Sequence, residues 1–156
     1  MILLDADVIL IDRKYKAYAR YAKNRAALEL LKADQLPLGM MAHAVLEVVG
    51  VMSHGTATND IPLIPAALQT IYGLAIIPDN VNEPNYARTT FDALIRQMMT
   101  KMSLGDAVQA VQIADFKPDA ELLLTWNAKH FVGKIAIPVL TPAEWLAQQI
   151  LTGPNP

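Results

Sequence analysis

Short apolar runs alternate with longer amphipathic segments from one end of the chain to the other. Residues 1–10 are almost wholly apolar, which predicts a strand that is buried on both faces of a sheet. Later apolar runs of strand length cover residues 36–41, 74–77, 120–125 and 135–140. The last run contains Pro138, which cannot donate a hydrogen bond to a neighbouring strand, so we expect it at an edge of the sheet.

Segments with the periodicity of helices separate these runs. A broad apolar stripe over residues 12–32 predicts the first helix. A capping box at Thr141-Pro-Ala-Glu144 begins the last one. The other expected helices cover residues 42–52, 65–72, 83–101 and 103–114. Because strands that alternate with helices are typical of a mostly parallel sheet, the sequence predicts an α/β fold, a three-layer α/β/α sandwich around about five strands.

The composition fits one domain with a large core. The chain has 156 residues, of which 53% are hydrophobic, and we expect residues 1–150 to form a single domain and 151–156 a flexible tail. No apolar stretch approaches the roughly 18 residues of a membrane span, and no basic leader precedes the first apolar run. The absence of cysteine excludes disulfides and thiolate metal sites, and it fits a cytoplasmic protein.

Basic residues are concentrated near the N-terminal end. The net charge of the chain is -2, yet residues 11–33 contain seven lysines and arginines against two acids. From charge alone, a solvated helix face is the simpler interpretation. A polyanionic partner is the alternative.

Three acids in distant segments are the candidates for chemistry. Asp5 follows the first apolar run, and Glu47 lies in the otherwise apolar helix 42–52, where an ionised carboxylate is costly unless it is paired or bound to metal. Asp106 begins a helix after Ser103, a pattern that also serves as an ordinary cap. Because strand ends and helix starts share one edge of such a sheet, the three acids are expected to converge on a divalent cation.

Other polar residues near these acids are open to two interpretations. Asn127 lies just past a predicted strand and can present its amide oxygen to water or metal, although asparagine is equally ordinary in a turn. Asp7 would share a strand face with Asp5 if the strand continued, and we interpret it as a turn residue. His43 precedes Glu47 by one helical turn, where it could ligate a metal, and we interpret it as a packing residue at the start of the helix.

The segments that carry these residues resemble the motifs of the PIN domain, the metal-dependent nuclease fold of VapC-type toxins and related ribonucleases. Asp5 stands in the opening motif Leu4-Asp-Ala-Asp-Val-Ile-Leu10, Glu47 in Ala44-Val-Leu-Glu47, and Asp106 in Leu104-Gly-Asp-Ala107. The run Leu124–Phe131 and the closing run Ile137–Trp145 also match, so the resemblance covers residues 1–146 in order and spacing.

The resemblance implies a Mg²⁺- or Mn²⁺-dependent endoribonuclease. Asp5 and Asp106 would contact the metal, directly or through water, and Glu47 would hold or activate the attacking water. Asn127 and Thr125 would orient water or the scissile phosphate. Among the residues beside them, Lys129 and His130 could reach a phosphate oxygen. The basic residues of 13–25 could follow an RNA backbone, with Tyr15, Tyr18 or Tyr21 stacking on bases.

The resemblance further implies a homodimer and an antitoxin protein as partners. Two departures from the family pattern support a different reading, a catalytically weak or inactive PIN-like module that binds nucleic acid or protein. Ala6 stands where the family often has a hydroxyl residue, and Asn127 stands where many members have a fourth acid. Asn127 also lowers the negative charge available to a second metal ion.

Overall fold

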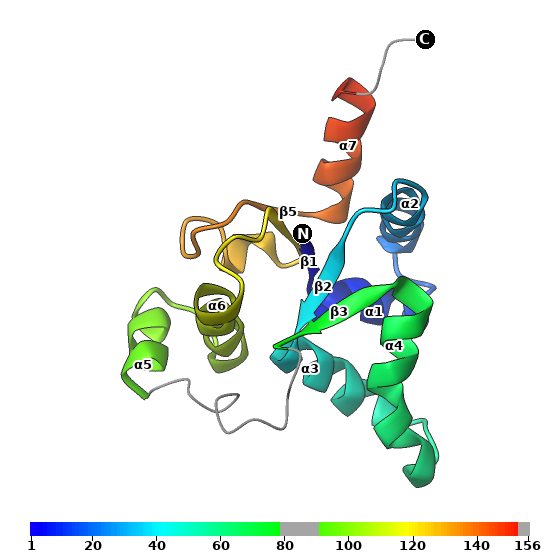
Figure 1. Cartoon of the computed structure of the whole chain (residues 1–156), viewed down its shortest axis with the longest axis horizontal. Coiled ribbons are helices and arrows are strands. Elements are labelled where there is room, and N and C mark those ends of the chain that lie inside the picture. The colour runs from blue at the N-terminus through cyan, green and yellow to red at the C-terminus, as the bar shows by residue number, and fades with distance from the viewer. Residues whose placement is uncertain (79–90, 153–156) are drawn as a thin grey trace.

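Five parallel strands form one sheet in the order β3-β2-β1-β4-β5 (Figure 1). The structure is a computed structural model that describes residues 1–78 and 91–152. The strands are β1 (Ile2–Leu4), β2 (Leu38–Met41), β3 (Leu74–Ile77), β4 (Leu122–Leu124) and β5 (Val139–Leu140). The predicted parallel sheet of five strands is confirmed, and β5 lies at an edge as Pro138 indicates.

Helices cover both faces of the sheet, which gives three layers. They are α1 (Ala6–Arg13), α2 (Tyr21–Ala33), α3 (Ala42–Ser53), α4 (Ile64–Tyr72), α5 (Phe91–Met99), α6 (Leu104–Phe116) and α7 (Pro142–Thr152), with short 3₁₀ helices at η1 (Thr58–Leu63) and η3 (Ala128–His130). One core contains Leu4 and Leu124 with side chains of α1, α2, α3, α4 and α7. The other contains Leu3 and Leu123 packed against α6 and Phe131. In Figure 1, α5 and α6 lie on one side of the sheet and α2 and α4 on the other.

The register of the central strands determines which residues meet at the carboxyl edge of the sheet. Leu4 of β1 pairs with Leu124 of β4, so Asp5 and Thr125 leave neighbouring strands at the same level. Met41 of β2 is the last residue before α3. The ends of three adjacent strands therefore deliver polar segments to one edge.

The predicted boundaries of the first elements are wrong. The strand expected over residues 1–10 ends at Leu4, because Asp5 accepts a hydrogen bond from the Ala6 backbone N–H and caps α1. Helix α1 is buried on most of its surface, so its sequence is as apolar as a strand buried on both faces. The helix expected over 12–32 is two helices, separated by residues 14–20.

Other predicted boundaries are close to those observed. Helices α3 and α4 and strand β3 match their predicted positions within one residue, whereas β4 and β5 are shorter than expected. The predicted helix start at residue 83 and the tail beyond residue 152 lie outside the described residues, where α5 is seen from Phe91. In the described part of the chain, no helix combines the length and apolar character that crossing a membrane requires.

A buried acid ties three helices of one layer together. Asp12 of α1 is 3% exposed, accepts a hydrogen bond of 2.6 Å from the Tyr72 hydroxyl of α4, and lies 3.3 Å from Nη1 of Arg25 in α2. Burial and the neighbouring Asp12 carboxylate both raise the pKa of Tyr72, which keeps its hydroxyl protonated as a donor.

Tyr72→Phe is therefore expected to lower the free energy of unfolding by about 1.5–3 kcal/mol, because it removes a hydrogen bond to a buried charged group. Urea denaturation measures the change. Tyr18→Phe is the matched control, since the Tyr18 side chain is 55% exposed, and it should change stability by no more than about 0.5 kcal/mol. Equal stability of the two variants would contradict a stabilising role for the Asp12–Tyr72 contact.

Candidate active site

Asp5 is held at the end of the central strand by neutral groups. Its Oδ1 accepts from the Ala6 backbone N–H at 2.7 Å, and its Oδ2 accepts from the Thr125 hydroxyl at 2.7 Å. The residue is 6% exposed. Burial is the main cause that raises the pKa of Asp5, and the negative charge of Glu47 raises it further.

Asp7 lies beside Asp5 in the first turn of α1. Its Oδ2 accepts from the Trp126 backbone N–H at 3.0 Å and lies 3.3 Å from the Thr125 hydroxyl. Burial and the charge of Asp5 raise the pKa of Asp7 to about 7. Its other oxygen, Oδ1, is buried and has no hydrogen-bond partner in the described structure. Two adjacent acids thus share a site in which full ionisation is costly.

Thr125 is a positioning residue in this geometry. It is completely buried, its hydroxyl donates to Asp5, and the same oxygen accepts from the Asn127 backbone N–H at 3.0 Å. The role predicted for Thr125, orienting water or the scissile phosphate, stays a prediction. The hydroxyl links the end of β4 to the acids that follow β1.

Glu47 faces the site from α3. Its Oε1 lies 3.4 Å from Nε2 of His43, so the two side chains share one face as their spacing predicts. Gly105 of α6 packs against this pair, since a Cβ there would lie 2.9 Å from Glu47 Oε1. The desolvation argument for Glu47 is wrong, because its side chain is 43% exposed at the helix surface.

Asp106 is part of the cap of α6, and its carboxylate is partly exposed. Ser103 caps α6, its hydroxyl accepting from the Asp106 backbone N–H at 3.2 Å and donating to Asp106 Oδ2 at 2.8 Å. The same Oδ2 lies 3.1 Å from Nδ1 of His130, and the Asp106 side chain is 19% exposed. His130 therefore contacts Asp106. Asn127 and Lys129, which precede His130 in the same turn, are exposed.

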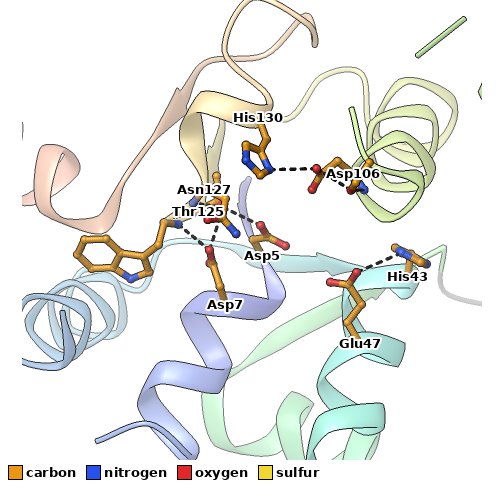
Figure 2. Close-up of polar contacts among 10 residues, drawn as sticks. Asp5, Asp7, His43, Glu47, Asp106, Thr125, Asn127 and His130 are labelled. Carbon is orange, nitrogen blue, oxygen red and sulfur yellow. Dashed lines mark hydrogen bonds and ion pairs between the residues drawn. The ribbon is translucent and has the colours of Figure 1, made fainter. Parts of the chain in front are cut away.

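Figure 2 shows Asp5, Glu47 and Asp106 directed toward one another from three different elements. They form an open arrangement, in which Asp5 is bonded to Thr125, Glu47 is paired with His43 and Asp106 with His130. Within residues 1–78 and 91–152, no three His, Asp or Glu side chains lie close enough together to hold one metal ion.

The donor chemistry still fits a hard cation. Mg²⁺ commonly binds through one or two carboxylates, with waters and substrate phosphates completing its octahedron, so it does not need a closed protein cage. Crowded carboxylates with raised pKa values, and a buried carboxylate oxygen without a partner, are features that a divalent cation would relieve.

Sequence reasoning interpreted Asp7 as a turn residue and missed Gln109. Asp7 could have been found only from a helix that starts at Ala6. Gln109 of α6 is 2% exposed, and its side chain lies close enough to Asp5 to lower the pKa of that carboxyl, although its Nε2 makes no hydrogen bond within 3.5 Å. The spacing of Asp106, Gln109 and Gln112 was the available signal, because three polar residues at intervals of three share one face of a helix.

Comparisons with known proteins support the fold. No family model matches the sequence, and no curated protein matches it either. A solved structure described as FitAB bound to an IR36 DNA fragment is similar, with a TM-score of 0.60 and 15% sequence identity over 92% of this chain and 96% of that chain. The likeness confirms the predicted three-layer, PIN-like fold.

Proposed function

We propose that the protein is a divalent-metal-dependent endoribonuclease of the PIN and VapC type, which hydrolyses phosphodiester bonds in RNA. The observation that carries the proposal is the position of Asp5, a buried acid at the end of the central strand whose hydrogen-bond partners are neutral. Glu47 and Asp106 face it from separate helices, and the PIN-like fold supports the same assignment.

Asp5 and Asp106 are the residues that would hold Mg²⁺ or Mn²⁺. When bound, the cation would neutralise the carboxylates, lower the pKa of a water and stabilise the charge that develops at phosphorus. Asp7 adds a partly buried carboxylate on the Asp5 side, and its Oδ1 has no hydrogen-bond partner in the described structure.

Other residues of the site would position water and substrate. Glu47 is exposed enough to accept a proton from the attacking water, and Nε2 of His43 lies 3.4 Å from its Oε1. Asn127 can orient the substrate as a neutral group. Lys129 is exposed and can contact a phosphate. His130, held by Asp106 through Nδ1, can donate to a phosphate oxygen through Nε2 when both ring nitrogens carry a proton.

Two partners follow from the family resemblance, an antitoxin protein and a second copy of this chain. Exposed apolar side chains on and after α5 support a protein partner of either kind, since Phe91 is 77%, Met99 78% and Leu104 58% exposed. Analytical ultracentrifugation of the purified chain would distinguish a homodimer from a monomer.

Cleavage of end-labelled single-stranded RNA tests the nuclease proposal. We expect cleavage with Mn²⁺ or Mg²⁺ and a fall to background with EDTA, because the carboxylates alone cannot activate water or neutralise the phosphate. Asp106→Asn should lower the cleavage rate by about 10- to 100-fold. Asp115→Asn is the matched control, since Asp115 is an exposed acid of the same helix that lies beside Arg96 and Lys134.

Equal cleavage by the wild type and both variants, or cleavage that persists in EDTA, would overturn the proposal. The open arrangement of the acids favours one rival, a PIN-like module that binds without cleaving. Calorimetry that detects Mn²⁺ binding, in a protein that cleaves neither RNA nor DNA, would establish that rival.

A further inference from the structure

A pocket of about 320 Å³ opens next to the carboxylates, on the side of Asp7 and Asn127. Aromatic and polar side chains line it, namely Asp7, Tyr15, Tyr18, Arg20, Trp126 and Asn127. The segment between α1 and α2 supplies the tyrosines and the arginine, and the chain just after β4 supplies Trp126 and Asn127. The proposed chemistry uses none of the aromatic residues.

The Trp126 wall of the pocket is fixed before any ligand binds. The indole N–H donates to Asn24 Oδ1 at 2.8 Å, and Asn24, which is completely buried, donates in turn to the Val8 carbonyl at 2.9 Å. The backbone N–H of Trp126 donates to Asp7. Because these bonds hold the ring in place, a flat ligand would lose little free energy to side-chain ordering on that side.

The rest of the lining combines aromatic rings with a cation. The Arg20 guanidinium carbon lies 5.2 Å from the Trp126 ring centroid and 5.7 Å from that of Tyr18, so the charge lies between two π faces. Tyr15 and Tyr18 are 45% and 55% exposed, which leaves their rings accessible to a ligand. Lys16 lies in the same segment as the two tyrosines and is exposed, whereas the Lys14 ammonium donates to the Val51 carbonyl at 2.7 Å and Arg13 lines a separate pocket.

We propose that this aromatic pocket binds one unstacked base of single-stranded RNA, next to the phosphate that the carboxylate site cleaves. The inference rests on the proposed function for its substrate. Proteins recognise single-stranded RNA by stacking bases on aromatic rings and arginine planes and by hydrogen bonds to the base edges. The tyrosines and Arg20 provide the stacking surfaces, and the exposed amide of Asn127 offers both a donor and an acceptor to a base edge.

The position of the pocket fits an RNA substrate better than a free small molecule. Asp7 and Asn127 line the pocket, and both connect through Thr125 to Asp5. A base held there would leave its own phosphate beside the acids, while the basic residues would contact the neighbouring phosphates. Arg20 in the pocket and the exposed Lys16 are the cations available for those phosphates.

Binding of fluorescein-labelled RNA, followed by anisotropy in EDTA to prevent cleavage, tests the inference. The probes are oligoadenylate, oligouridylate, oligocytidylate and oligoguanylate, and then the tightest binder with a single abasic ribose moved along its length. We expect one abasic position to weaken binding to the wild type by about 5- to 100-fold. Tyr18→Ala should weaken binding of the intact RNA by a similar factor and leave the abasic RNA unchanged.

Leu63→Ala is the control, since it removes an exposed apolar side chain outside the pocket and should bind both RNAs as the wild type does. Equal weakening of intact and abasic RNA by Tyr18→Ala, or unchanged binding of both, would overturn the inference and leave a protein partner as the occupant. If the protein cleaves RNA with metal but Tyr18→Ala does not weaken intact RNA selectively, the base-binding pocket is refuted and the nuclease proposal stands. If Tyr18→Ala weakens intact RNA selectively but no RNA is cleaved, the nuclease proposal is refuted and the base-binding pocket stands.

Discussion

Asp5→Asn is expected to reduce metal-dependent RNA cleavage by about 100-fold, because it removes a buried negative charge that is proposed to hold the cation. The fold should be unharmed. Asparagine can still accept the Ala6 N–H at its amide oxygen and donate its amide N–H to the Thr125 hydroxyl, which rotates to accept it. Since burial raises the pKa of Asp5, loss of the charge should also increase the free energy of unfolding at neutral pH without metal.

Initial cleavage rates and urea denaturation, measured on the same preparation, separate these two effects. A variant that loses activity and gains stability would show that Asp5 serves catalysis and lowers the free energy of unfolding. A variant that loses both would indicate that Asp5 serves the fold, as an ordinary cap of α1 does. Asp115→Asn should change neither quantity.

Asp7→Asn is expected to stabilise the metal-free protein at pH 8 by about 2–4 kcal/mol and to have little effect at pH 4. The ordinary pKa of an aspartic acid is 3.8, and burial beside Asp5 raises that of Asp7 to about 7. Between these values the folded protein holds a proton that the unfolded chain has released. Stability therefore falls as the pH rises from about 4 to 7, and the loss is complete above that range.

Denaturation midpoints between pH 4 and 8 in EDTA would measure this dependence. The wild type should lose stability across the range, whereas Asp7→Asn should lose less, its remaining slope coming from Asp5. Parallel curves for the two proteins would show that Asp7 ionises normally in the folded state. Asp119→Asn is a suitable control, because that acid is exposed beside Lys117 and precedes β4, whereas the site follows the carboxyl end of that strand.

Local sequence patterns predicted the parts of the fold that depend on neighbouring residues. The strand Leu74–Ile77 and the edge position of β5 follow from apolar runs and a proline, and the caps at Ser103 and Thr141 follow from their hydroxyl and acid pairs. Helix α1 could not be separated from β1, because a helix buried on most sides has no polar face to reveal its period.

The sequence indicated which acids of the candidate site to expect. It did not indicate which side chains these acids contact, because those contacts depend on tertiary packing. Nothing local shows that Thr125 would be fully buried against Asp5, since their hydrogen bond joins residues 120 positions apart. The exposure of Glu47 likewise depends on where α6 approaches α3. Asp7 gains its role from the helix start at Ala6, which moves its side chain toward Trp126.

The anchored indole beside the pocket also gives the protein an optical reporter. The chain has two tryptophans, and Trp145 is 3% exposed in the core, whereas Trp126 lies at the pocket and is partly open to solvent. A collisional quencher such as iodide should therefore reach Trp126 and leave Trp145 almost unaffected. A ligand in the pocket should then reduce the quenching of Trp126 fluorescence by iodide. This measurement needs no label and no turnover.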